Sequence, residues 1–241
     1  MKKIIIWVLS QLSKIIWYLI PSQIQKKYLS ISGDLNIYDI YKKEEIINSY
    51  NYYKKHMQKS ILLDTDEIRR YSIKKSLLND KAGVKFNLEF GVYTGSSINL
   101  LSEFCHKIYG FDSFQGLRDD WNGTTFKSGS LNLNKKLPNV RQNVILVQGW
   151  VEQTLENFLR EHNPVINFCH IDLDIYTSSA FVLKKIKPFM GERAIILFDE
   201  LYNYPGWECG EHKALKEVFN EKEYDFIAFS TTGSQAAIML K

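Results

Sequence analysis

The sequence has few cysteines. Its 241 residues include three, Cys105, Cys169 and Cys209, which lie far apart. No two of them have the spacing of zinc ligands, and an odd, dispersed set does not suit a disulfide framework. A chain of this length buries enough surface to fold without such links. We therefore expect reduced thiols and a cytoplasmic protein.

Other features are absent as well. The sequence has no internal repeat, no low-complexity linker and no basic stripe interleaved with aromatic residues. Its net charge of +4 comes largely from lysine pairs and the N-terminus, which is typical of a solvated surface, so we expect no nucleic-acid partner. The length fits one large α/β domain, or a smaller domain with an added N-terminal segment.

The most apolar segment, residues 4–20, lacks the features of a transmembrane helix or signal peptide. Ser10, Gln11, Ser13 and Lys14 interrupt it and cluster on one side of a helix, and no small-residue cleavage site follows. The pattern predicts an amphipathic helix. We favour packing of this helix against protein, including a second subunit, over its contact with a membrane surface. A true transmembrane span is the least favoured of the three alternatives. We expect a homo-oligomer, with peripheral membrane association as the alternative.

The rest of the chain changes character near residue 80. Residues 1–80 predict a helical N-terminal extension. In residues 81–241, short apolar runs alternate with helical segments, a pattern typical of a parallel sheet with both faces covered. The last two runs are joined by a hairpin-like turn. The expected strands are residues 86–90, 108–111, 144–148, 166–171, 194–198, 226–230 and 236–240.

The segment between residues 111 and 144 is long and predicts no helix. Loops of this length inside a compact domain are usually functional or mobile. This one begins at the carboxyl end of a strand, where open α/β sheets bind their ligands. We interpret it as a lid on the substrate side of a binding site.

A glycine loop joins the first strand of this sheet to a helix. Gly91 and Gly95 allow the backbone to approach a ligand closely, and the helix that begins near Ser96 offers free N–H groups. The denser glycine pattern of a dinucleotide site is missing. Glu89, just before the loop, suits an ammonium group better than a phosphate. The loop therefore favours a cofactor with an amino-acid group over a nicotinamide dinucleotide.

Two later strand ends support an adenosine-containing cofactor. Asp112 follows the second strand and can accept hydrogen bonds from both ribose hydroxyls; it lies roughly 20 residues beyond Glu89, as in nucleotide-binding sheets. Trp150 follows the third strand. Its ring could stack on adenine, and a buried packing role is the alternative.

Carboxylates gather after the fourth and fifth strands. His170, Asp172 and Asp174 alternate along the chain, and Asp199 and Glu200 end the next strand. Neighbouring parallel strands end at one edge of the sheet, so we expect these side chains to converge beside the cofactor. Three carboxylates suit Mg²⁺, which would acidify and orient a hydroxyl. The alternative is that the acids cap helices or share protons.

Taken together, these motifs resemble a known family, the macrocin O-methyltransferase type of class I methyltransferase, which uses S-adenosylmethionine (SAM). The similarity covers about residues 86–219 and is carried by GVYTGSS, YGFDSFQGL, GWVEQTL, HIDLDIYTSS and FDELYNYPGWECGEHKAL. The resemblance implies a Rossmann-like, doubly wound sheet of seven strands in the order 3-2-1-4-5-7-6, with the last strand antiparallel. It also implies Mg²⁺-dependent methylation of sugar hydroxyls.

The motifs and the resemblance together assign roles to residues. The expected SAM-binding residues are Glu89, Phe90, Gly91, Tyr93, Gly95, Ser96, Ser97, Asp112, Ser113 and Trp150. The expected metal ligands are Asp172, Asp199 and Glu200, the last a glutamate where the family usually has aspartate. The expected base is Asp172, with His170 and His212 as alternatives.

We therefore expect an Mg²⁺-assisted SAM-dependent O-methyltransferase whose substrate is a hydroxyl-bearing small molecule or glycan. One alternative is a hydroxylase-like relative with other chemistry, which the Glu200 departure keeps open. The other is a non-catalytic protein that retains the cofactor pocket. The sequence does not name the methyl acceptor.

Overall fold

The computed structural model divides into two compact units, Met1–Lys43 and Glu44–Lys241. It describes residues 12, 16, 17, 19–21, 24 and 36–241. Most of the amphipathic helix predicted at residues 4–20 therefore lies outside the described residues. Within the described part of the chain, no helix combines the length and the apolar character needed to cross a membrane.

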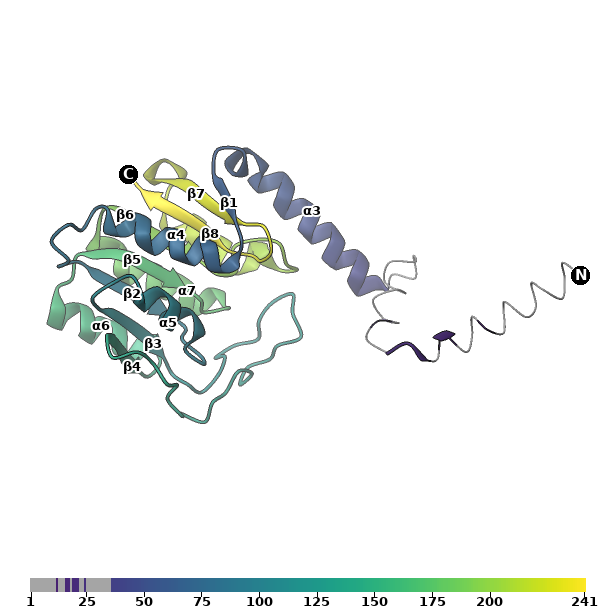
Figure 1. Ribbon diagram of the computed structural model, residues 1–241, viewed down its shortest axis with the longest axis horizontal. Helices are drawn as coiled ribbons and strands as arrows, with labels where there is room; N and C mark the ends of the chain where they lie inside the picture. The colour runs from purple at the N-terminus through teal and green to yellow at the C-terminus, as the bar shows by residue number, and fades with distance from the viewer. Residues whose placement is uncertain (1–11, 13–15, 18, 22–23, 25–35) are drawn as a thin grey trace, which may run out of the picture. The chain divides into compact units, whose positions relative to one another are not determined.

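A mixed sheet of eight strands forms the centre of the second unit (Figure 1). The strands lie in the order β1-β7-β8-β6-β5-β2-β3-β4, and β8 is antiparallel to both of its neighbours. In chain order they are β1 (Ile61–Leu63), β2 (Phe86–Phe90), β3 (Ile108–Asp112), β4 (Val144–Gln148), β5 (Ile166–Ile171), β6 (Met190–Phe198), β7 (Tyr224–Ser230) and β8 (Ala236–Leu240).

The Rossmann-like α/β class is confirmed, but the predicted count of seven strands is wrong. The additional strand, β1, pairs in parallel with β7 at the edge of the sheet. The strand order therefore differs from the predicted one by this strand beyond β7. A run of three residues between two helices is too short to show the alternation by which a strand is recognised.

Helices cover both faces of the sheet (Figure 1). Side chains of α4 and α5 pack with one set of buried strand residues, and those of α6, α7, α8 and the end of α3 pack with the other. The helices are α3 (Ile37–Met57), α4 (Thr65–Leu77), α5 (Ser96–Ser102), α6 (Val151–His162), α7 (Tyr176–Ile186) and α8 (Glu211–Val218), with 3₁₀ turns at Lys187–Phe189, Trp207–Cys209 and Glu221–Glu223.

The start of α4 is fixed by a capping box. The Asp64 side chain accepts a hydrogen bond from the Glu67 N–H, and the Glu67 side chain accepts one from the Asp64 N–H. Such a cap satisfies two otherwise free N–H groups and stabilises a helix by about 1 kcal/mol. It sets the register of α4, which places Arg69 against Asp199 at the end of β6.

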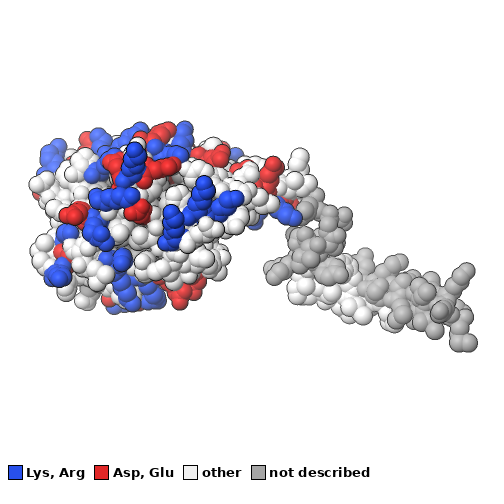
Figure 2. Space-filling model, turned by 90° about the horizontal axis from the view of Figure 1, so that it is seen from above, with Lys and Arg blue, Asp and Glu red and all other residues white. Residues whose placement is uncertain are grey.

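The surface of the second unit mixes charges of both signs. On the face seen in Figure 2, acidic side chains lie among basic ones. On the second unit, exposed ion pairs include Arg70 with Glu103 and Lys185 with Glu156. Exposed pairs of this kind contribute little to stability, so the surface gives few clues to function.

The end of α3 is anchored by Tyr53, which is fully buried. Its ring packs beside Tyr202 and Trp207, and its hydroxyl lies 2.5 Å from His212 Nδ1. Burial, helped by the charge of Lys216, lowers the pKa of His212 to about 4. The imidazole is therefore neutral at pH 7, and its Nδ1 can accept a hydrogen bond from the Tyr53 hydroxyl.

We expect His212 to make the fold sensitive to acid. Its pKa lies near 6.5 when the chain is unfolded and at about 4 when folded, so the unfolded state binds more protons between these values. The stabilisation is complete above pH 6.5 and is lost as pH falls, with about 2 kcal/mol gone by pH 5. Urea unfolding between pH 7.5 and pH 5 should show a shallower decline for His212→Gln than for the wild type. Equal slopes would contradict this assignment.

Candidate functional site

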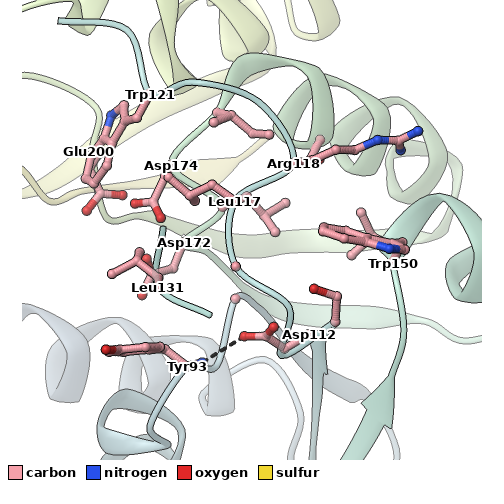
Figure 3. Close-up of a pocket in the computed structure, with 17 residues that line it drawn as sticks. Tyr93, Asp112, Leu117, Arg118, Trp121, Leu131, Trp150, Asp172, Asp174 and Glu200 are labelled. Atoms are coloured by element: carbon pink, nitrogen blue, oxygen red, sulfur yellow. Dashed lines mark hydrogen bonds between the residues drawn. The ribbon is translucent and has the colours of Figure 1, made fainter. Parts of the chain in front are cut away.

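A cavity of about 300 Å³ lies at the carboxyl ends of the central strands (Figure 3). Its walls come from the loop after β2, the ends of β3 and β5, and the residues that precede α6. Leu117, Trp121 and Leu131 of the segment between β3 and β4 close another side. The predicted lid therefore borders the cavity, and the cavity lies at the expected edge of the sheet.

Asp112 holds the glycine loop in place at one end of the cavity. Its Oδ2 accepts hydrogen bonds from the N–H groups of Val92 and Tyr93, both at 2.8 Å, and its Oδ1 accepts one from Phe114 at 2.6 Å. Gly91 has φ +89°, and a Cβ there would lie 1.6 Å from the Asp172 carbonyl oxygen. The β2 and β5 ends can meet this closely only with glycine at this position.

The predicted cofactor residues fall into two groups. Those that border the cavity are Gly91, Tyr93, Asp112, Ser113 and Trp150. Those that do not border it are Glu89, Phe90, Gly95, Ser96 and Ser97. Phe90 stacks on Phe111 in the core. Gly95 faces Pro138 and Val140.

Glu89 lies behind the loop, with no exposed surface. Its Oε1 accepts a hydrogen bond from the Ser97 hydroxyl at 2.7 Å, and its Oε2 lies 3.3 Å from His170 Nδ1. Glu89 and His170 are paired in register on the neighbouring strands β2 and β5. The side chain that the sequence assigned to the cofactor ammonium therefore has a protein cation as its partner.

Four side chains form a buried charge chain beneath the cavity: Arg69, Asp199, His170 and Glu89. Asp199 Oδ1 accepts hydrogen bonds from Arg69 Nη2 at 2.8 Å and Gln235 Nε2 at 3.1 Å, and lies 3.2 Å from His170 Nε2. The charge chain links α4 to β6, β5 and β2. Asp199, a predicted metal ligand, does not line the cavity, but one of its oxygens lies within 4.8 Å of ligand atoms of both Asp172 and His170.

The charges in this chain alternate in sign. Burial lowers the pKa of His170, but the hydrogen bonds and charges of Asp199 and Glu89 outweigh it and raise that pKa to about 10. Burial would raise the pKa of Asp199, yet His170, Arg69 and Gln235 hold it well below its usual range. His170 is therefore already protonated at neutral pH and cannot accept a substrate proton, and its lack of exposed surface keeps substrate away.

Three carboxylates border the other end of the cavity. One oxygen from each of Asp172, Asp174 and Glu200 lies within 4.8 Å of the other two. Burial and the neighbouring negative charges raise the pKa values of all three, that of Asp174 to about 7. Figure 3 shows Asp174 and Glu200 turned toward one another, with Asp172 beside them. Such a group is electrostatically strained unless a cation or protons neutralise it.

His212, an alternative predicted base, lies apart from this cavity. Its Nδ1 lies beside the Tyr53 hydroxyl, and its ring centroid is 4.7 Å from that of Trp207. These residues belong to the core cluster on the face of the sheet that α6, α7 and α8 cover. The sequence pattern places it near a helix start, which is correct. It does not show that the first turn of α8 faces the core rather than the cavity.

The lid is held by backbone contacts that only glycine permits. A Cβ on Gly123 would lie 1.9 Å from the Pro205 carbonyl oxygen, and one on Gly206 would lie 2.5 Å from that of Asn122. The Thr177 hydroxyl also donates to Asp119 at 2.8 Å. These contacts fix the segment that carries Trp121 over the carboxylates.

Two residues of the site have little or no role in the sequence analysis. Arg69 lies in the N-terminal extension, far from the motifs, and nothing in its surroundings marks it. Asp174 alternates with Asp172, and this spacing indicates that both side chains can lie on one side of the chain. The sequence analysis nevertheless assigned the metal to Asp199 and Glu200 of the next strand and gave Asp174 no role. The three-dimensional arrangement brings both residues to the site.

Comparison with known proteins identifies a domain in this part of the chain. Residues 88–201 match a family model described as a methyltransferase domain. No curated protein matches the sequence. The matched segment includes the glycine loop, Asp112, Trp150 and the three cavity carboxylates.

Several solved structures share the fold. The calicheamicin methyltransferase CalS11 is 21% identical, with a TM-score of 0.59 over 88% of this chain and 89% of that one. Its apo form, described as a TDP-rhamnose 3'-O-methyltransferase, is 20% identical, with a TM-score of 0.51 over 88% and 90%. The O-methyltransferase NovP is 16% identical, with a TM-score of 0.52 over 73% and 79%. The family match indicates a methyltransferase domain in residues 88–201, and these solved structures share the fold of the chain.

Proposed function

We propose that this protein transfers the methyl group of SAM to a hydroxyl of a sugar or glycosylated small molecule, with help from Mg²⁺. The observation that carries the proposal is the division of one cavity into two ends. Asp112 and Trp150 lie at one end, and the three carboxylates lie at the other. A cofactor and a metal-held acceptor could therefore meet within one cavity.

The first end suits the adenosine part of SAM. An ionised carboxylate has about four acceptor sites. Asp112 uses three of these for loop N–H groups, so one on Oδ1 is left for a ribose hydroxyl. Trp150 offers an aromatic face to adenine, and the Ser113 hydroxyl also borders the cavity. Glu89 would act indirectly, by fixing His170 and the start of α5.

The second end suits a hard divalent cation. Asp172 and Glu200 would hold it, and both border the cavity. Glu200 Oε2 is buried and has no hydrogen-bond partner among the described residues, so a cation would satisfy it. Carboxylate oxygens are the ligands that Mg²⁺ prefers. When bound, Mg²⁺ would lower the pKa of an acceptor hydroxyl and orient it.

The protein's own groups would supply positioning and proton transfer. Without a bound cation, burial and neighbouring acids raise the pKa of Asp172 well above its usual range. Asp172 borders the cavity beside the proposed metal, so it would be the group that accepts the hydroxyl proton. Leu117, Trp121 and Leu131 give one wall of this space an apolar surface. Alignment of the hydroxyl with the methyl group accounts for much of the rate in such a transfer.

The class of acceptor is suggested by the structural neighbours. CalS11 is described as acting on TDP-rhamnose, a nucleotide-linked sugar. In this chain, the Arg118 side chain lies at the cavity, half exposed, 3.1 Å from Glu152. It could exchange this partner for an acidic group on a substrate. A sugar hydroxyl close to such a group is the acceptor that we propose.

The first test of this function is methyl transfer itself. We expect transfer of label from SAM to one or more nucleotide-linked sugars when Mg²⁺ is present. Excess EDTA should abolish it, and added Mg²⁺ should restore it. Asp172→Asn should lower kcat by about 100-fold or more, because general-base catalysis is lost. Full turnover in EDTA would contradict the metal, and failure to methylate any hydroxyl acceptor would contradict the reaction.

A second test concerns the cofactor end. Asp112→Asn should weaken SAM binding by about 10-fold or more, because a charge-assisted hydrogen bond is lost and the loop is held less firmly. Asp120→Asn is the matched control, since Asp120 is an exposed acid in the same segment that pairs with Lys127. Calorimetry should show this difference and no heat with NAD. Equal SAM affinity in both variants would contradict the assignment of Asp112.

A further inference from the structure

The apolar side chains of the first unit have no core to pack into. Among the described residues of Met1–Lys43, none is buried. Leu12, Ile16 and Leu19 are helical, and these residues are 48%, 58% and 78% exposed. Residues separated by four and then three positions lie on one face of a helix. An exposed apolar face of this kind marks a contact with another surface.

The same character continues where α3 begins. Ile37 and Ile40 lie three residues apart on this helix and are also exposed. A unit of about 40 residues rarely builds a sufficient core by itself. The first unit therefore needs a partner that covers apolar side chains.

The first unit also carries the excess positive charge of the protein. Met1–Lys43 contains seven lysines and two aspartates, which give a net charge of +5. The 24 basic and 25 acidic residues of Glu44–Lys241 give −1. Both aspartates of the first unit follow residue 33, so the charged side chains of residues 1–33 are all lysines. This asymmetry favours an anionic partner.

An anionic membrane surface matches both properties. Its acyl chains cover apolar side chains, and its headgroups attract lysines. A second copy of the chain could cover the apolar face, but a symmetric contact would bring two units of charge +5 together. Nucleic acid matches the charge but offers no apolar layer to leucine and isoleucine. The apolar pattern alone favours a protein partner, and the charge distribution reverses this preference.

We propose that the first unit binds the protein to the surface of an anionic phospholipid membrane. Leu12, Ile16 and Leu19 enter the boundary between headgroups and acyl chains, and the lysines of residues 1–33 pair with the headgroups. This contact holds the chain at the membrane without a span. It goes beyond the proposed methyl transfer and does not depend on it.

The test is flotation of the whole chain with vesicles of phosphatidylcholine, made with and without phosphatidylglycerol. We expect binding to the vesicles that contain phosphatidylglycerol, at least about 10-fold weaker binding to phosphatidylcholine alone, and release by added salt. The apolar triple variant, Leu12→Gln with Ile16→Gln and Leu19→Gln, should bind about 10-fold more weakly or less, because its apolar contact is lost.

A matched control replaces exposed apolar residues of the second unit. It combines Leu78→Gln, Val84→Gln and Val165→Gln, at residues that are 66%, 74% and 51% exposed. This variant should bind vesicles as the wild type does. Thermal unfolding, followed by circular dichroism, should be unchanged in both triple variants, since neither removes a buried side chain.

A lysine variant tests the charge separately. Lys2→Gln, Lys3→Gln and Lys14→Gln together should weaken binding to phosphatidylglycerol vesicles by about 10-fold or more, because the attraction to the headgroups falls. Unchanged binding in this variant would overturn the inference that the surface is anionic.

The other outcomes are equally decisive. A wild type that binds neither kind of vesicle, or an apolar triple variant that binds as well as the wild type, would overturn the inference. A wild-type dimer that becomes monomeric in the apolar triple variant, seen by light scattering, would assign this face to a second copy. A lower unfolding temperature in that variant alone would show that protein covers these side chains. Methyl transfer to soluble acceptors is measured without vesicles, so the proposed function stands or falls separately.

Discussion

The ion pair between Arg69 and Asp199 connects the N-terminal helical region to the site. It places a cation from α4 at the end of β6. Asp199 also pairs with His170 on β5, and His170 pairs in turn with Glu89 on β2. Each buried charge in this series is tolerated because its neighbour has the opposite sign. The series fixes the carboxyl ends of β6, β5 and β2, which carry the cavity.

The cavity side of the same strand ends has the opposite character. Below, charges alternate in sign; above, Asp172, Asp174 and Glu200 lie close together, and among the described residues none of the three forms an ion pair with a lysine or arginine. Their raised pKa values reflect burial and mutual repulsion. The alternating charges stabilise the strand ends, while the cavity carboxylates remain open to protons or to a cation from solution. The lid borders this part of the cavity with Leu117, Trp121 and Leu131.

Much of this arrangement could be predicted from the sequence, for physical reasons. Strand positions follow from apolar runs, and strand ends place Asp112, Trp150, Asp172 and Glu200 at one edge. The sequence does not show toward which neighbour a side chain near a strand end points. Glu89, for example, faces His170 and not the cavity. Partners from distant segments do not follow either, as Arg69 shows. The strand β1 was too short for its pattern to be recognised.

The central claim is that one cavity holds a SAM-type cofactor beside a metal bound by Asp172 and Glu200. The most direct measurement is a crystal structure of the full chain with S-adenosylhomocysteine and Mn²⁺, with the anomalous signal of manganese recorded. We predict cofactor density along Asp112 and Trp150 and an anomalous peak beside Asp172 and Glu200. Cofactor density outside the cavity, or the lack of an anomalous peak at these carboxylates, would contradict the account.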